Sequence, residues 1–150
     1  MQKLRRFLQL SRPDRSLVFQ AVLITAVIRL SLELLSLRTV QRLAMGLSWR
    51  CDQVLSPRRV VWAVRSAAHF VPRSTCLVQA LAAQVLLIQQ GYRPRLTIGV
   101  AKRESDHFVA HAWVTCEDEV LIGGADIGNY TALLDLEADC FAGWRRSEFL

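Results

Sequence analysis

The chain has 150 residues, of which 52% are apolar and 21% are charged. This balance excludes an intrinsically disordered protein, and the length suits one domain with a buried core. The formal net charge is +6, but the basic residues follow no nucleic-acid-binding motif and no aromatic side chains alternate with them, so we expect a solvated basic surface and no nucleic-acid partner.

The first predicted element is an apolar helix. The run LVFQAVLITAVI, residues 17–28, is followed by Arg29 and Glu33, which stand four residues apart and can pair on one helix face. The run is well short of the roughly 20 residues that a spanning helix needs. We therefore expect a core or interface helix, with peripheral membrane contact as the alternative. No secretory signal is recognised, so we expect a reduced, cytoplasmic setting, with membrane association only through this helix.

Helical periodicity continues through the first half of the chain. Residues 14–47 are predicted to form two helices with a break near 37–39, and a shorter helix is predicted over 60–70. Ser and Pro at the start of the shorter helix fit its N-cap and first helical position. These elements make 1–71 the helical N-terminal region of a single domain that spans the whole chain, with 72–150 as its second region.

A further helix is predicted within PRSTCLVQALAAQVLLIQQGY, residues 72–92. Ser74 or Thr75 can cap its start, and Gly91 stands where a left-handed C-terminal cap belongs. The interior is apolar on most sides, which predicts a central, buried helix.

After this helix the apolar residues alternate with a period of two. Three strands are predicted over residues 95–102, 108–116 and 120–123, joined by short charged connections. Short connections imply antiparallel pairing. The predicted fold class is therefore α+β: a helical layer and one buried helix packed on a small antiparallel sheet.

Cys76 is the candidate nucleophile. The predicted caps place it in the first turn of the helix, where free amide groups and the positive end of the helix dipole stabilise a thiolate and can hold an oxyanion. From this pattern alone, an inert buried cysteine stays open as the alternative. The chain has no Cys-x-x-Cys pair, so no structural metal site is expected. Three further cysteines lack a helix-start position: Cys51, Cys116 and Cys140. Mild reactivity is expected of Cys116, which ends the second predicted strand.

His111 is the candidate base. It shares a face of the strand FVAHAWVTC with Trp113, among small residues, and an imidazole held there over a packed helix can act as base toward Cys76. A histidine that is merely part of the core stays open as the alternative. His69, at a helix end, and His107, in a polar loop, are expected to be structural.

The helix and the strands together resemble a known family. The stretch STCLVQALAAQVLLIQQGYRPRLTIGV, followed by FVAHAWV and a third short strand, is similar to the transglutaminase-like (papain-like) cysteine peptidases of lasso-peptide biosynthesis. These small bacterial enzymes remove the leader from a ribosomally made precursor. The resemblance covers residues 72–124 and implies a transglutaminase-like fold with Cys76 as nucleophile and His111 as base.

The third catalytic residue departs from the family's pattern. The resemblance implies an acid near the end of the third strand, where this chain has Gly123 and Gly124. Asp126 follows shortly after, and a hairpin turn centred on residues 118–119 would place it opposite His111, close enough to orient the ring. A shift of one residue would turn it away. We predict Asp126 as the acid, with a Cys–His pair that lacks an acid as the alternative.

The resemblance also implies the reaction and its partners. Cleavage by a thiolate through an acyl-enzyme needs no metal and no organic cofactor. The implied partners are the precursor's leader peptide, a separate leader-binding recognition protein that presents it, and a macrolactam cyclase that consumes the freed core. Two other functions stay open: a thiol acyltransferase or transglutaminase of the same fold, and a non-catalytic binding or scaffold protein with a decayed triad.

Overall fold

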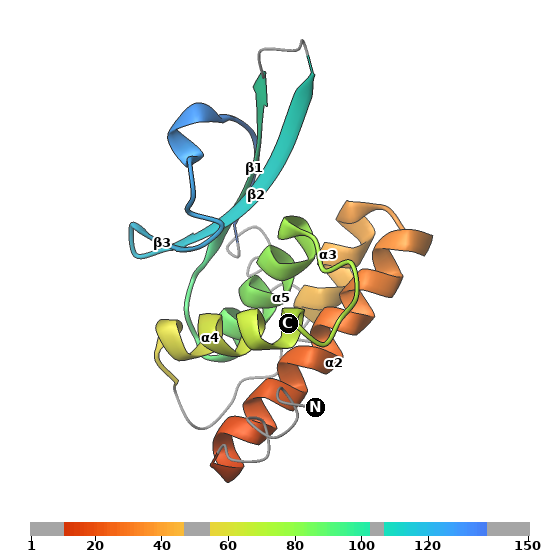
Figure 1. Ribbon diagram of the computed structural model, residues 1–150, viewed down its shortest axis with the longest axis vertical. Coiled ribbons are helices and arrows are strands. Elements are labelled where there is room, and N and C mark those ends of the chain that lie inside the picture. Colours follow the sequence, from red (N-terminus) through yellow and green to blue (C-terminus); the bar gives the residue numbers. More distant parts are fainter. Residues whose placement is uncertain (1–10, 47–54, 103–106, 138–150) are drawn as a thin grey trace, which may run out of the picture.

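A helical layer lies on one side of a four-stranded antiparallel sheet in the computed structural model, which describes residues 11–46, 55–102 and 107–137 (Figure 1). Helices make up the first half of the described chain and strands the second. The predicted α+β class is confirmed. The core lies between the layers, because buried side chains of the helices and of the sheet form one apolar cluster.

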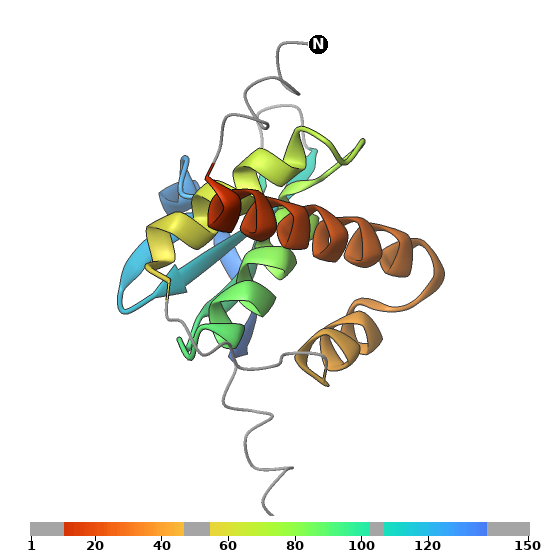
Figure 2. The same ribbon diagram turned by 90° about the horizontal axis from the view of Figure 1, so that it is seen from below.

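The first two helices form a hairpin. α2 runs over Arg12–Leu34 and α3 over Leu37–Gly46, and the extended backbone of Leu35 separates them. The break therefore comes earlier than the predicted position near 37–39. Figure 2 shows α2 running across α4 and α5, with α3 folded back beside the C-terminal part of α2.

α2 buries one face and exposes the other. Its buried side chains recur at helical spacing and pack in the core: Leu17, Val18, Ala21, Thr25 and Ile28. The predicted pair of Arg29 and Glu33 is confirmed, with 2.6 Å between Nη1 and Oε1. The 23-residue helix has a window of mean hydropathy 1.9, so it is long and apolar enough to cross a bilayer. That length exceeds the apolar run predicted from the sequence.

Two further helices complete the layer. α4, Pro57–Ala68, begins with Ser56 at the N-cap and proline in the first turn, as predicted, although it ends before the predicted residue 70. α5, Cys76–Gln89, begins after the N-cap Thr75, and most of its side chains are buried. The predicted central helix is thus confirmed.

The sheet has the order β3-β2-β1-β4. β1, Arg95–Lys102, and β2, Phe108–Cys116, have the predicted bounds. β3 covers Glu119–Ile122, one residue earlier than predicted. β4, Thr131–Glu137, follows the short helix η1, Ile127–Asn129, and was not predicted. It pairs antiparallel with β1, so β1 is a central strand.

The turn between β2 and β3 differs from the predicted one. Cys116 pairs with Glu119, so the loop consists of Glu117 and Asp118. Both loop residues have positive φ, 51° and 64°, as a two-residue type I′ turn requires. The predicted turn centre at 118–119 is therefore wrong by one position, and the pairing shifts once more at a bulge between Val114 and Thr115.

Candidate active site

Cys76 is the first residue of the central helix α5. The Thr75 side chain caps the helix, because its Oγ1 accepts a hydrogen bond from the Val78 amide at 3.4 Å. The amides of Cys76 and Leu77 lie in the first turn, where no helical carbonyl can pair with them. The Cys76 side chain is half-buried against the core. The structure thus places this thiol beside free amide groups at a helix start, as predicted.

The segment that leads into α5 is held in a fixed path. Arg73 has a positive φ of 56°, a conformation that a residue with a side chain adopts at a cost. Gln79 reaches back from the helix and donates from Nε2 to the Ser74 carbonyl at 3.0 Å. This hydrogen bond restrains the backbone immediately before Cys76.

His111 lies in β2, opposite Gly99 of β1. Its Nε2 lies 2.8 Å from the carbonyl oxygen of Gly123, just after the end of β3. A carbonyl oxygen can only accept a hydrogen bond, so Nε2 carries the proton and donates. In the neutral ring Nδ1 is then free to accept a proton. This is the protonation pattern of a base that works through Nδ1.

Two aromatic side chains flank the histidine ring. The ring centroid of Tyr130 lies 5.3 Å from that of His111, and the centroid of Trp113 lies 6.3 Å away. Trp113 is buried and its ring lies against Gly99, where an added Cβ would come within 2.7 Å of the Trp113 ring atom Cη2. The glycine therefore makes room for the aromatic side chain beside His111.

The two candidate catalytic residues are carried by elements that pack together. α5 packs against β2, and Ala112 and Val114 of β2 join the core formed with the helices. His111 alternates with these two, so it shares a strand face with Trp113, as predicted, but this face is the one that points away from the helical core. The expectation that the imidazole is held over the packed helix is therefore wrong. Within the described ranges no hydrogen bond joins Cys76 Sγ to the His111 ring. Catalytic hydrogen bonds of substrate-free enzymes are commonly long, and the Cys76–His111 pair stays a prediction.

Asp126 does not take the position that the predicted hairpin gave it. The turn at 117–118 and the bulge change the register, and β3 ends at Ile122 before reaching Asp126. The Asp126 side chain is exposed at the start of η1, where the residue has a φ of 58°. In the described part of the chain, the hydrogen bond recorded for the His111 ring goes to the Gly123 carbonyl. The role of Asp126 as the acid stays a prediction.

The remaining cysteines and histidines differ in their positions and in their exposure to solvent. Cys116 is buried, and burial followed by the charge of Glu117 raises the pKa of its thiol. The expected mild reactivity of Cys116 is therefore wrong, since the thiol stays protonated near neutral pH. His69 is the C-cap of α4. Cys51 and Cys140 lie outside the described residues. Within the described residues, no group of three or more His, Cys, Asp or Glu side chains could hold a metal ion.

Two groups that contact His111 were not predicted from the sequence. The Gly123 carbonyl is a backbone group, and no side-chain pattern reports it. Tyr130 precedes β4, a strand that was not predicted, so its position beside His111 could not be inferred. The paired glycines at the end of β3 were the available signal, because glycine allows close backbone approach.

A comparison with known protein families finds a match that covers most of the chain. Residues 21–135 match a family described as the Transglutaminase-like superfamily, which includes cysteine peptidases and acyltransferases. The match spans Cys76, His111 and Asp126. No curated protein and no solved structure gives a significant match.

Proposed function

Since the chain belongs to the transglutaminase-like superfamily, we propose that it is a cysteine peptidase that removes the leader from a lasso-peptide precursor. The observation that carries the enzymatic reading is a half-buried thiol on the first residue of α5, packed beside the strand whose histidine donates from Nε2 to a carbonyl. The finer assignment to lasso-peptide precursors rests on the resemblance of residues 72–124.

The first half of the proposed reaction forms an acyl-enzyme. His111 Nδ1 takes the proton from Cys76, and the thiolate attacks the carbonyl carbon at the junction of leader and core. The free amides of Cys76 and Leu77 are the donors available to the oxyanion. When the carbon–nitrogen bond breaks, the protonated imidazole gives its proton to the departing core amine, and the leader stays bound as a thioester.

The second half releases the leader. Neutral His111 removes a proton from a water molecule, the resulting hydroxide attacks the thioester carbon, and the carbon–sulfur bond breaks. The leader leaves as a carboxylic acid and Cys76 returns as a thiol after protonation. All these steps use groups of the chain and water.

The proposed partners follow from the proposed reaction. The precursor's leader peptide is the substrate, a separate leader-binding recognition protein presents it, and a macrolactam cyclase consumes the freed amine of the core. A cytoplasmic location fits these partners, because precursor synthesis and ATP-dependent cyclisation take place there.

Acyl transfer is a second candidate function, favoured by the acyltransferases within the same superfamily. In this reaction an amine replaces water in the second half and forms a new amide. Pocket shape decides between the two acceptors, and the fold does not. The products distinguish them by mass, since hydrolysis adds water and aminolysis adds the amine.

The direct test incubates the purified chain with a lasso-peptide precursor and a leader-binding protein, and follows the products by mass spectrometry. We expect a leader with a free carboxylate and a core with a free amine. Cys76→Ala should lower turnover by at least about 10⁴-fold, as loss of a nucleophile does. Cys116→Ala, which removes a buried thiol, is the matched control. A Cys76→Ala variant with wild-type turnover would contradict Cys76 as the nucleophile. Absence of turnover in the wild type as well would favour the non-catalytic scaffold.

A further inference from the structure

We infer that the backbone carbonyl of Gly123 orients His111 in place of the family's acid, and that Asp126 is not needed for this. The inference rests on the proposed thiol chemistry for its functional meaning. Its geometric basis is the 2.8 Å contact between His111 Nε2 and the Gly123 oxygen. Gly123 lies at the end of β3, where the resemblance implies a carboxylate.

The backbone at Gly123 leaves no space for a side chain. Its φ is +75°, and an added Cβ would lie 2.5 Å from the Ala112 carbonyl oxygen and 3.0 Å from Trp113 Cα. Both are atoms of the β2 backbone, which cannot move aside cheaply. Only glycine lets the chain pass this close to β2. The close approach brings the Gly123 carbonyl within reach of His111.

The surroundings keep the ring in this orientation. Tyr130 and Trp113 flank the imidazole, and Trp113 itself is only 8% exposed. Buried Trp113 and half-buried Tyr130 limit the access of water to the hydrogen bond, which strengthens it, and they restrict rotation of the ring. A neutral carbonyl fixes the tautomer as a carboxylate would, but it stabilises the imidazolium less because it carries no full charge.

Gly124 provides a matched control for Gly123. An added Cβ at Gly124 would meet the Val120 side chain at 3.2 Å, and this side chain can shift. Gly123→Ala should therefore displace the carbonyl, whereas Gly124→Ala should leave it in place. Asp126→Asn tests the alternative orienting group, because it removes the carboxylate and keeps the shape of the side chain.

The decisive measurement is ¹⁵N NMR of the imidazole nitrogens in the histidine-labelled full chain, with His111→Gln to assign the signals. At a pH where the ring is neutral, we expect the Nε2–H tautomer in the wild type, in Gly124→Ala and in Asp126→Asn. Gly123→Ala should lose this preference. The inference would be overturned if the wild-type ring were in the Nδ1–H form. It would also be overturned if the tautomer changed in Asp126→Asn and not in Gly123→Ala.

Reactivity gives a second readout. We expect Gly123→Ala to slow alkylation of Cys76 by iodoacetamide by roughly 10²-fold, the lower end of what a positioned base contributes, with a changed pH profile. If Gly123→Ala fails to fold, an ester in place of the Gly123–Gly124 amide weakens the acceptor without adding a side chain, and the same tautomer change is expected. The tautomer is measured without substrate, so the absence of peptidase activity would contradict the proposed function and leave this inference standing.

The outer face of α2 carries a second, independent inference. Five exposed apolar side chains follow one another at spacings of three and four residues, so they form a single stripe along the helix: Phe19, Leu23, Val27, Leu30 and Leu34. Their exposed fractions run from 50% to 83%. A continuous stripe of this kind marks an interaction surface.

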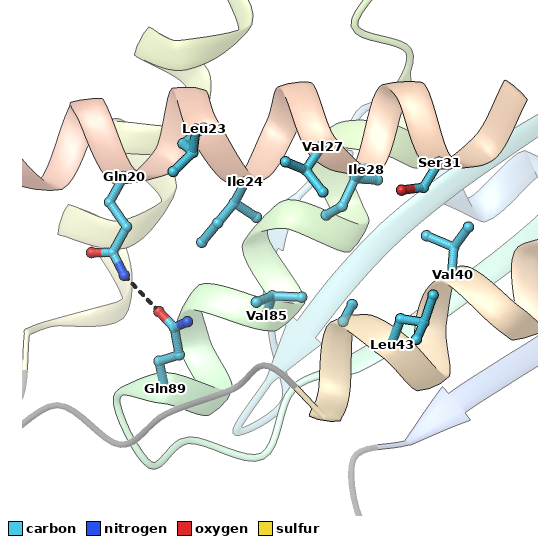
Figure 3. A pocket seen from close by; sticks show the side chains of 11 residues that line it. Gln20, Leu23, Ile24, Val27, Ile28, Ser31, Val40, Leu43, Val85 and Gln89 are labelled. Atoms are coloured by element: carbon cyan, nitrogen blue, oxygen red, sulfur yellow. Dashed lines mark hydrogen bonds between the residues drawn. The ribbon is translucent and has the colours of Figure 1, made fainter. Parts of the chain in front are cut away.

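A cleft lies beside the stripe, between α2, α3 and α5 (Figure 3). Its volume is about 300 Å³, and it is lined by apolar side chains including Val40 and Leu43 of α3 and Val85 of α5. At one end Gln20 donates from Nε2 to Gln89 Oε1 at 2.9 Å. Leu43 is itself 52% exposed, so the apolar surface continues from the stripe onto α3.

The charges around the stripe are basic. In the α2 to α3 hairpin, the two acidic side chains are already paired, Asp14 with Arg59 and Glu33 with Arg29. Four arginines at the two ends of the stripe have no ion pair within the described ranges: Arg12, Arg15, Arg38 and Arg42. An apolar stripe between basic ends matches the surface of an anionic bilayer.

We propose that α2 lies in the plane of an anionic membrane surface with this stripe toward the acyl chains. The helix does not cross the bilayer in this arrangement, because its opposite face, including Val18 and Ile28, is buried against the other helices. The partner is therefore a lipid surface that binds the folded chain.

Sedimentation with vesicles tests this proposal. We expect the full chain to bind vesicles of phosphatidylcholine mixed with phosphatidylglycerol, and to bind phosphatidylcholine alone at least about tenfold more weakly. Leu23→Asp with Leu30→Asp should abolish binding. Leu133→Asp is the matched control, since Leu133 is 65% exposed on β4, away from the stripe. The membrane proposal would be overturned if the wild type did not bind the vesicles, or if Leu133→Asp lost as much binding as the double variant. It would also be overturned if the wild type formed a dimer that the double variant disrupts, and bound no vesicles.

Discussion

The surroundings of His111 and the outer face of α2 differ in how precisely their atoms must be placed. Around His111, one ring nitrogen meets one carbonyl oxygen at 2.8 Å, and Gly99 and Gly123 leave no room for a methyl group. Along α2, large apolar side chains are at least half exposed to solvent. Orientation of a base requires atoms placed to within fractions of an ångström, whereas attachment to a fluid surface requires only composition and spacing. The first region should therefore be sensitive to small substitutions and the second tolerant of them.

The two faces of α2 give the largest expected difference. Ile28 is 3% exposed and Leu30 is 61% exposed. We expect Ile28→Ala to lower the free energy of unfolding by about 2–4 kcal/mol, because it leaves a cavity in the core. Leu30→Ala should change it by less than about 0.5 kcal/mol. Urea denaturation followed by circular dichroism measures both, and equal losses would contradict an exposed stripe.

The glycines near His111 give the next effect. Gly99→Ala should cost about 1–3 kcal/mol of unfolding free energy, since its Cβ would press on the Trp113 ring and on the Thr131 carbonyl. The same change should displace Trp113 and lower the rate of Cys76 alkylation. Gly128→Ala is the control, because an added Cβ there meets nothing within 4 Å. Equal stability of Gly99→Ala and Gly128→Ala would show that the space beside Gly99 can accept a methyl group.

Cys116 gives a smaller, pH-dependent effect. Its folded pKa is raised by burial, so the folded state holds the proton more tightly than the unfolded state. The corresponding stability is complete below the unfolded pKa of roughly 8.5 and is lost as the pH rises through the folded pKa. We expect the urea midpoint to fall between neutral and alkaline pH, and to fall less in Cys116→Ala. Near neutrality, peptide mapping after brief iodoacetamide treatment should find Cys76 labelled before Cys116.

Asp14 gives the smallest effect. The hydrogen bond from Ser11, and then the one from Arg59, lower the pKa of its carboxyl group. The stability that this provides is present above the unfolded pKa of about 3.9 and is lost as the pH falls through the folded value. Because the group is solvated, Asp14→Asn should only slightly flatten the acid limb of the stability curve. A large change at neutral pH would mean that the ion pair with Arg59 holds α2 to α4.

The helices and the first strands could be predicted because their signals are local. Thr75 caps α5, Gly91 has the positive φ of a helix end, and β1 has the bounds that its alternation indicates. β4 could not be predicted in the same way. It is an edge strand of mostly exposed residues with low β propensity, and its pairing with β1 defines it.

The candidate site was predictable in its side chains and not in its backbone. A cysteine after a capping threonine, and a histidine that alternates with small core residues along a strand, can be recognised in the sequence. The register of the β2–β3 hairpin does not, because the I′ turn at Glu117 and Asp118 and the bulge after Val114 each shift the pairing by one residue. These shifts decide whether a carboxylate or a carbonyl meets His111.

The position of β1 has a consequence for synthesis on the ribosome. β1 leaves the ribosome well before β4, so one of its edges stays open until Thr131–Glu137 has emerged. The same late strand accepts a hydrogen bond from α5, where Gln84 Nε2 donates to the Leu136 carbonyl at 2.8 Å. A nascent chain that stalls before β4 thus exposes an unpaired strand and a buried amide without its acceptor. Such chains are the ones that we expect chaperones to bind and proteases to remove.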